Sequence, residues 1–215
     1  MLEGILRPSG NLSAVLIKGY RKAPLSWTIR NRAHWHFLKS WFGVKVVIPI
    51  ARAFGIMTAY AELRAVHING KTGVKTDYGV ISYRVITDAG VAFLVDAWQN
   101  SVELEIMKYH GAGTGTGAEA AGDTTLGTES TTALNPDSTR ATGSLTEGAT
   151  GNIFKTVGTL TFDADAAITE HGVFSQEATG GGTLWDRSKF SAINVVGASG
   201  DSIQFTYQVT FTSGG

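Results

Sequence analysis

The most regular hydrophobic pattern in the sequence lies near its C-terminus. Between Ser202 and Thr212, apolar and polar residues alternate over five repeats, which is the period of a β-strand with one buried face. A second pattern covers Ala167–Ser191, where two apolar segments flank the triple glycine 180–182 and predict a hairpin. An isolated hairpin is only marginally stable in water, so we expect other strands to cover its apolar face.

Most of the remaining second half of the chain is also predicted to be β. The candidate strands are short, and clusters of Gly, Asn, Asp or Ser separate them. About eight strands with one helix, preceded by an N-terminal arm, are typical of a mainly β protein built as an antiparallel β-sandwich or jelly roll. The predicted strands are 80–86, 102–110, Leu126–Ala133, Thr139–Leu145, Ile153–Phe162, Ala167–Ser175, Thr183–Phe190 and Ser202–Thr212.

One turn and one helix are predicted between the first of these strands. Asn69-Gly70 has the composition of a two-residue type I′ turn, which needs positive φ at both central positions. Asp88 is a suitable N-cap for a helix over Ala89–Gln99. We expect the apolar stripe of this helix to pack on a sheet as core; it consists of Val91, Leu94, Val95 and Trp98.

Residues 1–56 differ from the rest of the chain in composition. They hold nine Lys or Arg residues, a single acid and three tryptophans, and Asn31–Phe42 has the spacing of a short helix. The simplest division is therefore a basic, aromatic N-terminal arm over 1–56 and one β domain over 57–215. Four alternatives remain open for the arm: a segment that orders only on a partner, a solvated extension, a weak nucleic-acid contact through its aromatic and basic residues, or an over-extended reading frame that should start at Met57.

The net charge of zero conceals a strong asymmetry along the chain. Residues 1–75 hold 12 basic residues and 2 acids, whereas residues 76–215 hold 6 basic residues and 16 acids, which gives +10 and −10. Such a split favours a basic segment docked on an acidic body, either its own or that of a neighbouring copy.

Composition also narrows the possible classes of protein. The chain has no cysteine, which excludes disulfides, cysteine zinc sites and a thiol nucleophile. The apolar segment 44–63 is interrupted by Lys45, Pro49, Arg52 and Glu62, so we expect no membrane span, and residues 12–17 are too short for a secretory signal.

Several residue groups have spacings that invite a chemical role, but none is specific. The glycine-rich segment Gly111–Gly117 lacks the Gly-Lys-Ser/Thr of a phosphate-binding loop, and no Gly-x-Ser-x-Gly accompanies the possible triads. We therefore predict no catalytic, cofactor or metal site, and the partner-binding residues stay unassigned. The groups are instead expected to form an ordinary connecting loop, hydrogen-bonded histidines at buried or edge positions, an acidic turn, and exposed ion pairs with cross-strand partners. The groups are His34 and His36 as a metal pair; Asp163 and Asp165 as an Asp-x-Asp; Glu170, His171 and Asp201 with Ser175 or Ser202 as a triad; His110; and Asp186-Arg187.

Short motifs rich in glycine, aromatic and charged residues follow one another between Asp77 and Thr212. They are Lys108-Tyr109-His110-Gly111, Gly113-Thr114-Gly115-Thr116, Arg140-Ala141-Thr142-Gly143, Ile168-Thr169-Glu170-His171-Gly172-Val173-Phe174, Leu184-Trp185-Asp186-Arg187-Ser188 and Asp201-Ser202-Ile203-Gln204-Phe205-Thr206-Tyr207. In this order they resemble a group of tailed-bacteriophage structural proteins.

The resemblance implies a virion component without enzymatic activity. A capsid decoration or cement protein is the first expectation, which would bind and stabilise neighbouring major capsid subunits, commonly as a small homo-oligomer and often through extended arms. A tail, neck or tail-fibre component is the alternative within this class, and a carbohydrate-binding module that uses an exposed Trp185 is the alternative outside it. The expected location is the virion, assembled in the host cytoplasm, with other virion proteins as partners and no cofactor.

Overall fold

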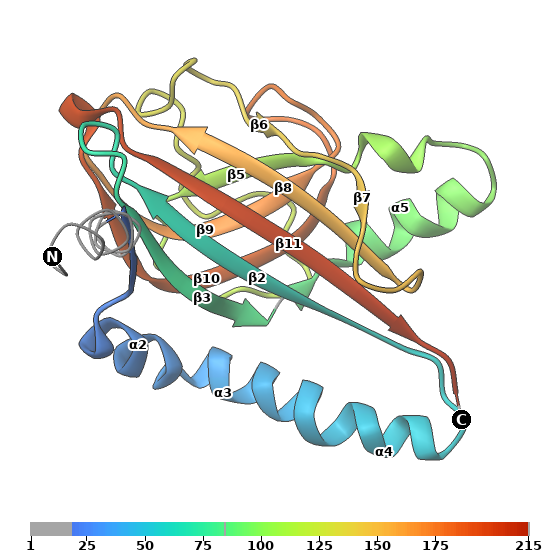
Figure 1. The fold of residues 1–215 in the computed structure, drawn as a ribbon. Coiled ribbons are helices and arrows are strands. Elements are labelled where there is room, and N and C mark those ends of the chain that lie inside the picture. Colours follow the sequence, from blue (N-terminus) through green and yellow to red (C-terminus); the bar gives the residue numbers. More distant parts are fainter. Residues whose placement is uncertain (1–18, 84, 215) are drawn as a thin grey trace, which may run out of the picture.

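The computed structural model describes residues 19–83 and 85–214, with His36 and Val85 described by their backbone alone, and the fold is mainly β with two sheets (Figure 1). The larger sheet has the strand order β1-β3-β2-β11-β8-β7, and the smaller has the order β4-β10-β9-β5-β6. All strand pairs are antiparallel except β1 with β3. The bounds are β1 Tyr20–Lys22, β2 Thr58–Ile68, β3 Lys75–Tyr83, β4 Val85–Ile86, β5 Tyr109–Gly113, β6 Ala141–Thr142, β7 Thr146–Glu147, β8 Ile153–Thr161, β9 Ala166–Phe174, β10 Leu184–Val195 and β11 Ser202–Thr212.

Strand β11 lies in the middle of the larger sheet and confirms the strand predicted from the alternating pattern. It pairs with β2 from Ser202↔Ile68 to Thr212↔Thr58, and with β8 on its other side. Its apolar positions 203, 205, 207 and 209 are at most 1% exposed, because they all face the smaller sheet's side of the molecule.

The predicted hairpin is confirmed as β9 and β10, which pair antiparallel in the smaller sheet. Their connection contains Gly180 and Gly182, both at φ 77°, a conformation that residues with a Cβ rarely adopt. The ladder shifts register between Lys189 and Ile193, where β10 carries more residues than β9.

The core lies between the two sheets. It joins Leu63 and Phe205 of the larger sheet to Ile168 and Phe190 of the smaller sheet, and the rings of Phe190 and Phe205 are 6.1 Å apart. Each such side chain contributes about 1.5–3 kcal/mol on burial. Mutual coverage of the two apolar faces therefore supplies the main stabilisation of the fold.

Helix α5 (Asp88–Trp98) confirms the predicted helix, but of its predicted core stripe only Leu94 is partly buried and packs against the core. Val91, Val95 and Trp98 are 54%, 42% and 71% exposed, whereas Gly90 and Phe93 are buried. The helix approaches β10 at Gly90, where a Cβ would lie 2.3 Å from the Trp185 carbonyl oxygen. Close backbone contact at the glycine turns the apolar stripe outward.

The N-cap of α5 is Thr87 rather than the predicted Asp88. The Thr87 hydroxyl accepts a hydrogen bond from the Gly90 N–H at 3.0 Å, which satisfies one of the unpaired amides of the first turn.

Three predicted strands and one predicted turn are wrong. Segment 102–110 contains a 3-10 turn, η2 (Leu104–Ile106), followed by the start of β5. Segment 126–133 forms one isolated bridge, at Glu129, and of 139–145 only β6 is a strand. The amides of Gly127 and Thr128 in the second of these segments bind the side chain of Glu170, as described below. The turn after β2 spans residues 69–74, with positive φ at Gly73, so Asn69-Gly70 is not a two-residue turn.

The described part of the arm is largely helical. α2 (Leu25–Arg32), α3 (Trp35–Phe42), a π-helical turn η1 (Gly43–Val47) and α4 (Ile48–Ala53) follow one another beside the edge of the larger sheet, so Asn31–Phe42 is not a single helix (Figure 1). α2 contacts β10, and α3 contacts β3. Within 19–83 and 85–214, no helix is both long and apolar enough to cross a membrane.

The arm is attached to the sheets through α2. Trp27 is 6% exposed and its indole N–H donates to the Ala192 carbonyl at 2.8 Å. Asn31 donates to the Ile81 carbonyl and accepts from the Ser191 N–H, so one side chain bridges β3 and β10. The division of the chain at Met57 stays a prediction.

Candidate functional site

The most concentrated polar cluster surrounds Glu170 of β9 and Arg187 of β10. Glu170 lies opposite Lys189 in the ladder, so Arg187, two residues away from Lys189, projects from the same face of the sheet. The Arg187 guanidinium donates to Glu170 Oε2 from Nε at 2.9 Å and from Nη2 at 2.7 Å. Both side chains are buried, with 0% and 4% of their surface exposed.

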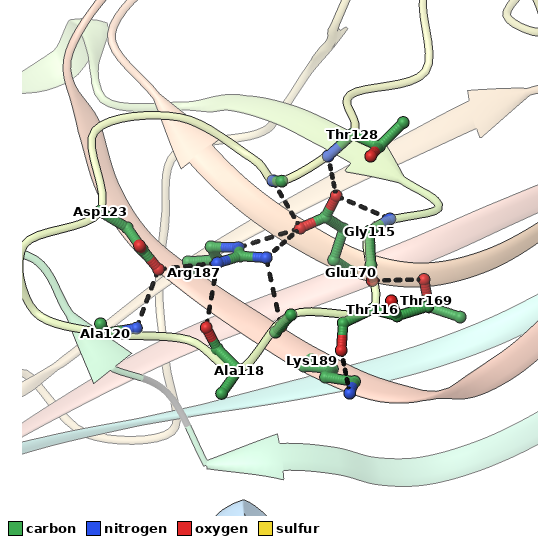
Figure 2. A network of polar contacts seen from close by, with 12 residues as sticks. Gly115, Thr116, Ala118, Ala120, Asp123, Thr128, Thr169, Glu170, Arg187 and Lys189 are labelled. Carbon is green, nitrogen blue, oxygen red and sulfur yellow. Dashed lines mark hydrogen bonds and ion pairs between the residues drawn. The ribbon is translucent and has the colours of Figure 1, made fainter.

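The segment 114–128, which we call the 114–128 loop, wraps around this ion pair (Figure 2). The N–H groups of Gly115 and Thr128 donate to Glu170 Oε1 at 2.9 and 2.7 Å, and that of Gly127 donates to Oε2 at 2.9 Å. Glu170 therefore accepts five hydrogen bonds, three of them from the backbone of the loop.

Arg187 holds the other side of the same loop. Its Nη1 donates to Asp123 Oδ2 at 2.8 Å and to the Ala118 carbonyl at 3.3 Å. Burial alone would lower the pKa of Arg187, but the hydrogen bonds to Asp123 and Glu170 outweigh it and raise the pKa. The ion pair thus replaces the strand ladder that the loop lacks.

A second buried ion pair closes the neighbouring loops. Arg140 is 1% exposed and binds both carboxylate oxygens of Glu129, from Nε at 2.6 Å and from Nη2 at 3.0 Å. Its Nη1 donates to the Gln176 and Gly181 carbonyls, and the guanidinium stacks 3.4 Å from the centre of the Phe174 ring. Every donor direction of this arginine is directed inward.

The two histidines that were predicted to be buried and hydrogen-bonded lie against each other between the sheets. His110 Nδ1 is 3.0 Å from His171 Nε2, and His110 Nε2 is 3.1 Å from Thr156 Oγ1. Both histidines are 0% exposed, and the His171 ring packs 4.3 Å from that of Phe205. The prediction is confirmed for both residues.

The residues of the possible triad, which the sequence pattern did not favour, do not come together. Asp201 binds His67 Nε2 at 2.8 Å, the Asn69 side chain at 3.0 Å and the Gly70 N–H at 3.0 Å, whereas Glu170 and His171 belong to the two clusters above. Burial alone would raise the pKa of Asp201, but hydrogen bonds from the Gly70 N–H, His67 and the Val196 N–H outweigh it and lower the pKa.

The remaining predicted site residues lie apart. The Ser175 hydroxyl accepts from the Thr183 N–H, and Ser202 starts β11. His34 Nε2 is 3.2 Å from Ser191 Oγ, and the side chain of His36 lies outside the described residues. Asp163 and Asp165 lie in the β8–β9 connection, as predicted for an acidic turn.

The glycine-rich segment 111–117 is divided between β5 and the loop. Its amide at Gly115 binds the Glu170 carboxylate, so an internal anion occupies the position that a phosphate would take in a phosphate-binding loop. The prediction of an ordinary connecting loop is confirmed for residues 114–117, while 111–113 are part of β5.

Two exposure predictions on β10 are wrong. Asp186 and Arg187 are buried rather than exposed, although Arg187 does bind a cross-strand partner, Glu170 of β9. Trp185 is 7% exposed, and its indole N–H donates to the Tyr207 hydroxyl. Successive side chains of β10 point to opposite faces of the sheet, and both faces are covered, one by loops and the other by the larger sheet. Trp185, Asp186 and Arg187 are therefore all buried. Trp185 is therefore not a surface platform for a sugar ring.

Sequence reasoning missed Asp123, Glu129 and Arg140 as partners in these clusters. A signal was present: residues 76–215 hold only 6 basic residues among 16 acids. An isolated arginine in an acidic segment is typical of a buried pair, because each such cation has several acids available to neutralise it.

An apolar pocket of about 370 Å³ opens between the sheets beside α5. One carboxylate, Glu105, stands among otherwise apolar or aromatic residues. They are Leu94, Leu104, Met107, Leu145, Phe154, Trp185, Tyr207, Val209 and Phe211. The exposed stripe of α5 continues this surface outward, because Leu94 belongs to both.

No protein-family model matches this sequence, and no similar sequence is found among curated proteins. Within the described ranges, no group of three or more His, Asp or Glu side chains is arranged to hold a metal ion. The site is therefore interpreted from its own geometry.

Proposed function

We propose that this chain is a non-enzymatic structural protein of a tailed-bacteriophage particle that binds and stabilises neighbouring capsid subunits in a cement role. In this proposal the two sheets form a sandwich of the jelly-roll type that serves as a rigid support. Binding then takes place on surfaces outside the sheets' core.

One observation carries the proposal: each motif that resembles phage structural proteins contributes a buried residue to the interior. Glu170 and Arg187 hold the 114–128 loop, Arg140 holds the next loops, and His110 joins the sheets through Thr156 of β8. Such residues support a scaffold rather than a reaction centre, because their polar atoms are directed at other parts of the chain.

The outer surface supports a binding role. Apolar side chains are exposed on α3 and α5 and directly after α4, among them Trp35 at 71%, Trp98 at 71% and Phe54 at 78%. Large exposed apolar side chains that lie near one another are typical of protein–protein contact surfaces.

Purified phage particles provide the test. We expect the chain in particles washed at high salt, at a fixed ratio to the major capsid protein by mass spectrometry, and on the capsid in electron microscopy. Particles that lack the chain should release DNA at lower temperature, and added protein should restore the wild-type value. Absence from washed particles, a position in the tail, or unchanged thermal release would each overturn the cement role.

A further inference from the structure

Two surfaces of the chain are complementary in both polarity and charge. The first, which we call the arm surface, is the exposed part of α3–α4, where Trp41, Phe42 and Ile50 are 43–54% exposed and lie among Lys39 and Lys45. No acid occurs between residues 19 and 61, so this surface has no carboxylate and its lysines make it positively charged.

The second, which we call the α5 surface, consists of the exposed stripe of α5, the η2 turn and the apolar pocket beside them. Val95, Trp98 and Leu104 are 42–71% exposed, and Glu103 and Glu105 flank Leu104. Glu105 also lines the pocket, so an apolar cavity of about 370 Å³ has an anionic rim.

We infer that the arm surface of one copy docks on the α5 surface of a second copy of this chain. Apolar contact supplies affinity, while opposite charge sets orientation and excludes self-pairing of like surfaces. The inference rests on the proposed binding function and names its partner: another molecule of the same protein.

Within one molecule the two surfaces are separate. The arm follows the edge formed by β1, β3 and the start of β2, whereas the α5 surface adjoins β8 and β11 (Figure 1). A contact between two different surfaces is heterologous, so repetition of it generates rings or open filaments rather than a two-fold dimer. Such an arrangement suits a protein that covers a repeating shell.

Analytical ultracentrifugation of the full chain tests this directly. We expect wild-type protein to associate as its concentration rises, and more weakly at 0.5 M salt, because the charged groups are exposed and screened. Two double variants each remove one surface: Lys39→Glu with Lys45→Glu, and Glu103→Lys with Glu105→Lys. Each alone should weaken association at least tenfold.

A mixture of the two double variants provides the decisive measurement. In the mixture the unchanged arm surface of one variant meets the unchanged α5 surface of the other, and the two reversed surfaces are again opposite in charge, so association that neither variant shows alone should be restored. Lys71→Glu and Glu177→Lys, at exposed positions elsewhere, are the matched charge controls and should associate as wild type does. Trp98→Ala removes apolar area without changing charge and should weaken association as well.

Several results would overturn the inference. The first is a wild-type chain that remains monomeric at all concentrations. The second is a control variant that weakens association as much as the double variants do, and the third is a mixture of the double variants that stays monomeric. The fourth is an arm that binds DNA or anionic vesicles while the protein does not self-associate. None of these results concerns particle binding, so the proposed function would stand or fall separately. Conversely, self-association of a chain never found in particles would refute the cement role alone.

Discussion

Substitution of Glu170 by Gln tests whether the Glu170–Arg187 ion pair holds the 114–128 loop. The variant keeps the size of the side chain and one acceptor oxygen, which can still serve the Gly115 and Thr128 amides. The new NH2 group then faces the Gly127 N–H and two N–H groups of Arg187, all of which are donors. Donors cannot pair with one another, and the arginine loses one of its two carboxylate partners.

Removal of one member of a buried ion pair costs about 3–5 kcal/mol, because the remaining charge stays buried. A protein of this size is stabilised by about 5–15 kcal/mol in total. The thermal midpoint should therefore fall by about 6–20 °C, at about 2–4 °C per kcal/mol. We expect urea unfolding followed by tryptophan fluorescence to give the same loss of free energy.

A control and a double-mutant cycle make the reasoning refutable. Glu177→Gln changes an exposed carboxylate that accepts one long hydrogen bond from Thr142, at 3.3 Å, and should stay within about 0.5 kcal/mol of wild type. Arg187→Met should cost less in the Glu170→Gln background than in wild type, with a coupling of at least about 1 kcal/mol. Equal stability of Glu170→Gln and Glu177→Gln, or additive effects in the cycle, would show that the pair does not hold the loop.

Three further predictions concern the residues around the sheets. Gly115→Ala should lower the free energy of unfolding in urea by about 1–3 kcal/mol, because its Cβ would lie 2.3 Å from Glu170 Oε1. Gly117→Ala has open space around its Cβ and should leave the stability unchanged. Equal effects of the two variants would contradict this. Asp201→Asn should be less stable than wild type at neutral pH but approach it in acid. Because the pKa of Asp201 is lowered in the folded state, the carboxylate stabilises the fold above the unfolded pKa near 3.8, and this contribution is lost as pH falls through the folded pKa. A difference in unfolding free energy that stays constant from pH 7 to 2 would refute this. Thr87→Ala should cost about 1 kcal/mol by loss of the α5 cap, whereas Thr87→Ser should restore it, and an equally unstable serine variant would argue against the cap.

Local pattern predicted the elements that bury one continuous face. The alternation in β11 and the hairpin β9–β10 were visible because each strand presents every second side chain to the opposite sheet. The existence of α5 was also visible, but its buried face was not. That face depends on backbone contact at Gly90 with a residue about a hundred positions away, which a helical stripe does not encode.

The loops could not be predicted in the same way. Segment 126–133 has the composition of a strand, yet its amides at Gly127 and Thr128 bind the side chain of Glu170 rather than a neighbouring backbone. The candidate site was predicted only as separate residues for the same reason. Glu170 and Arg187 were recognised individually, whereas their burial follows from a loop that the sequence pattern does not place.

The pairing of β2 with β11 has a consequence for synthesis of the protein. The hydrogen-bonded partners Thr58 and Thr212 are 154 positions apart, and these strands are adjacent in the middle of the larger sheet. During synthesis β2 emerges long before its partner β11, so the edge of β2 that pairs with β11 stays unpaired until β11 has been made. High contact order of this kind slows folding and leaves the nascent chain open to aggregation, because β2 lacks one of its two neighbouring strands until β11 has been synthesised.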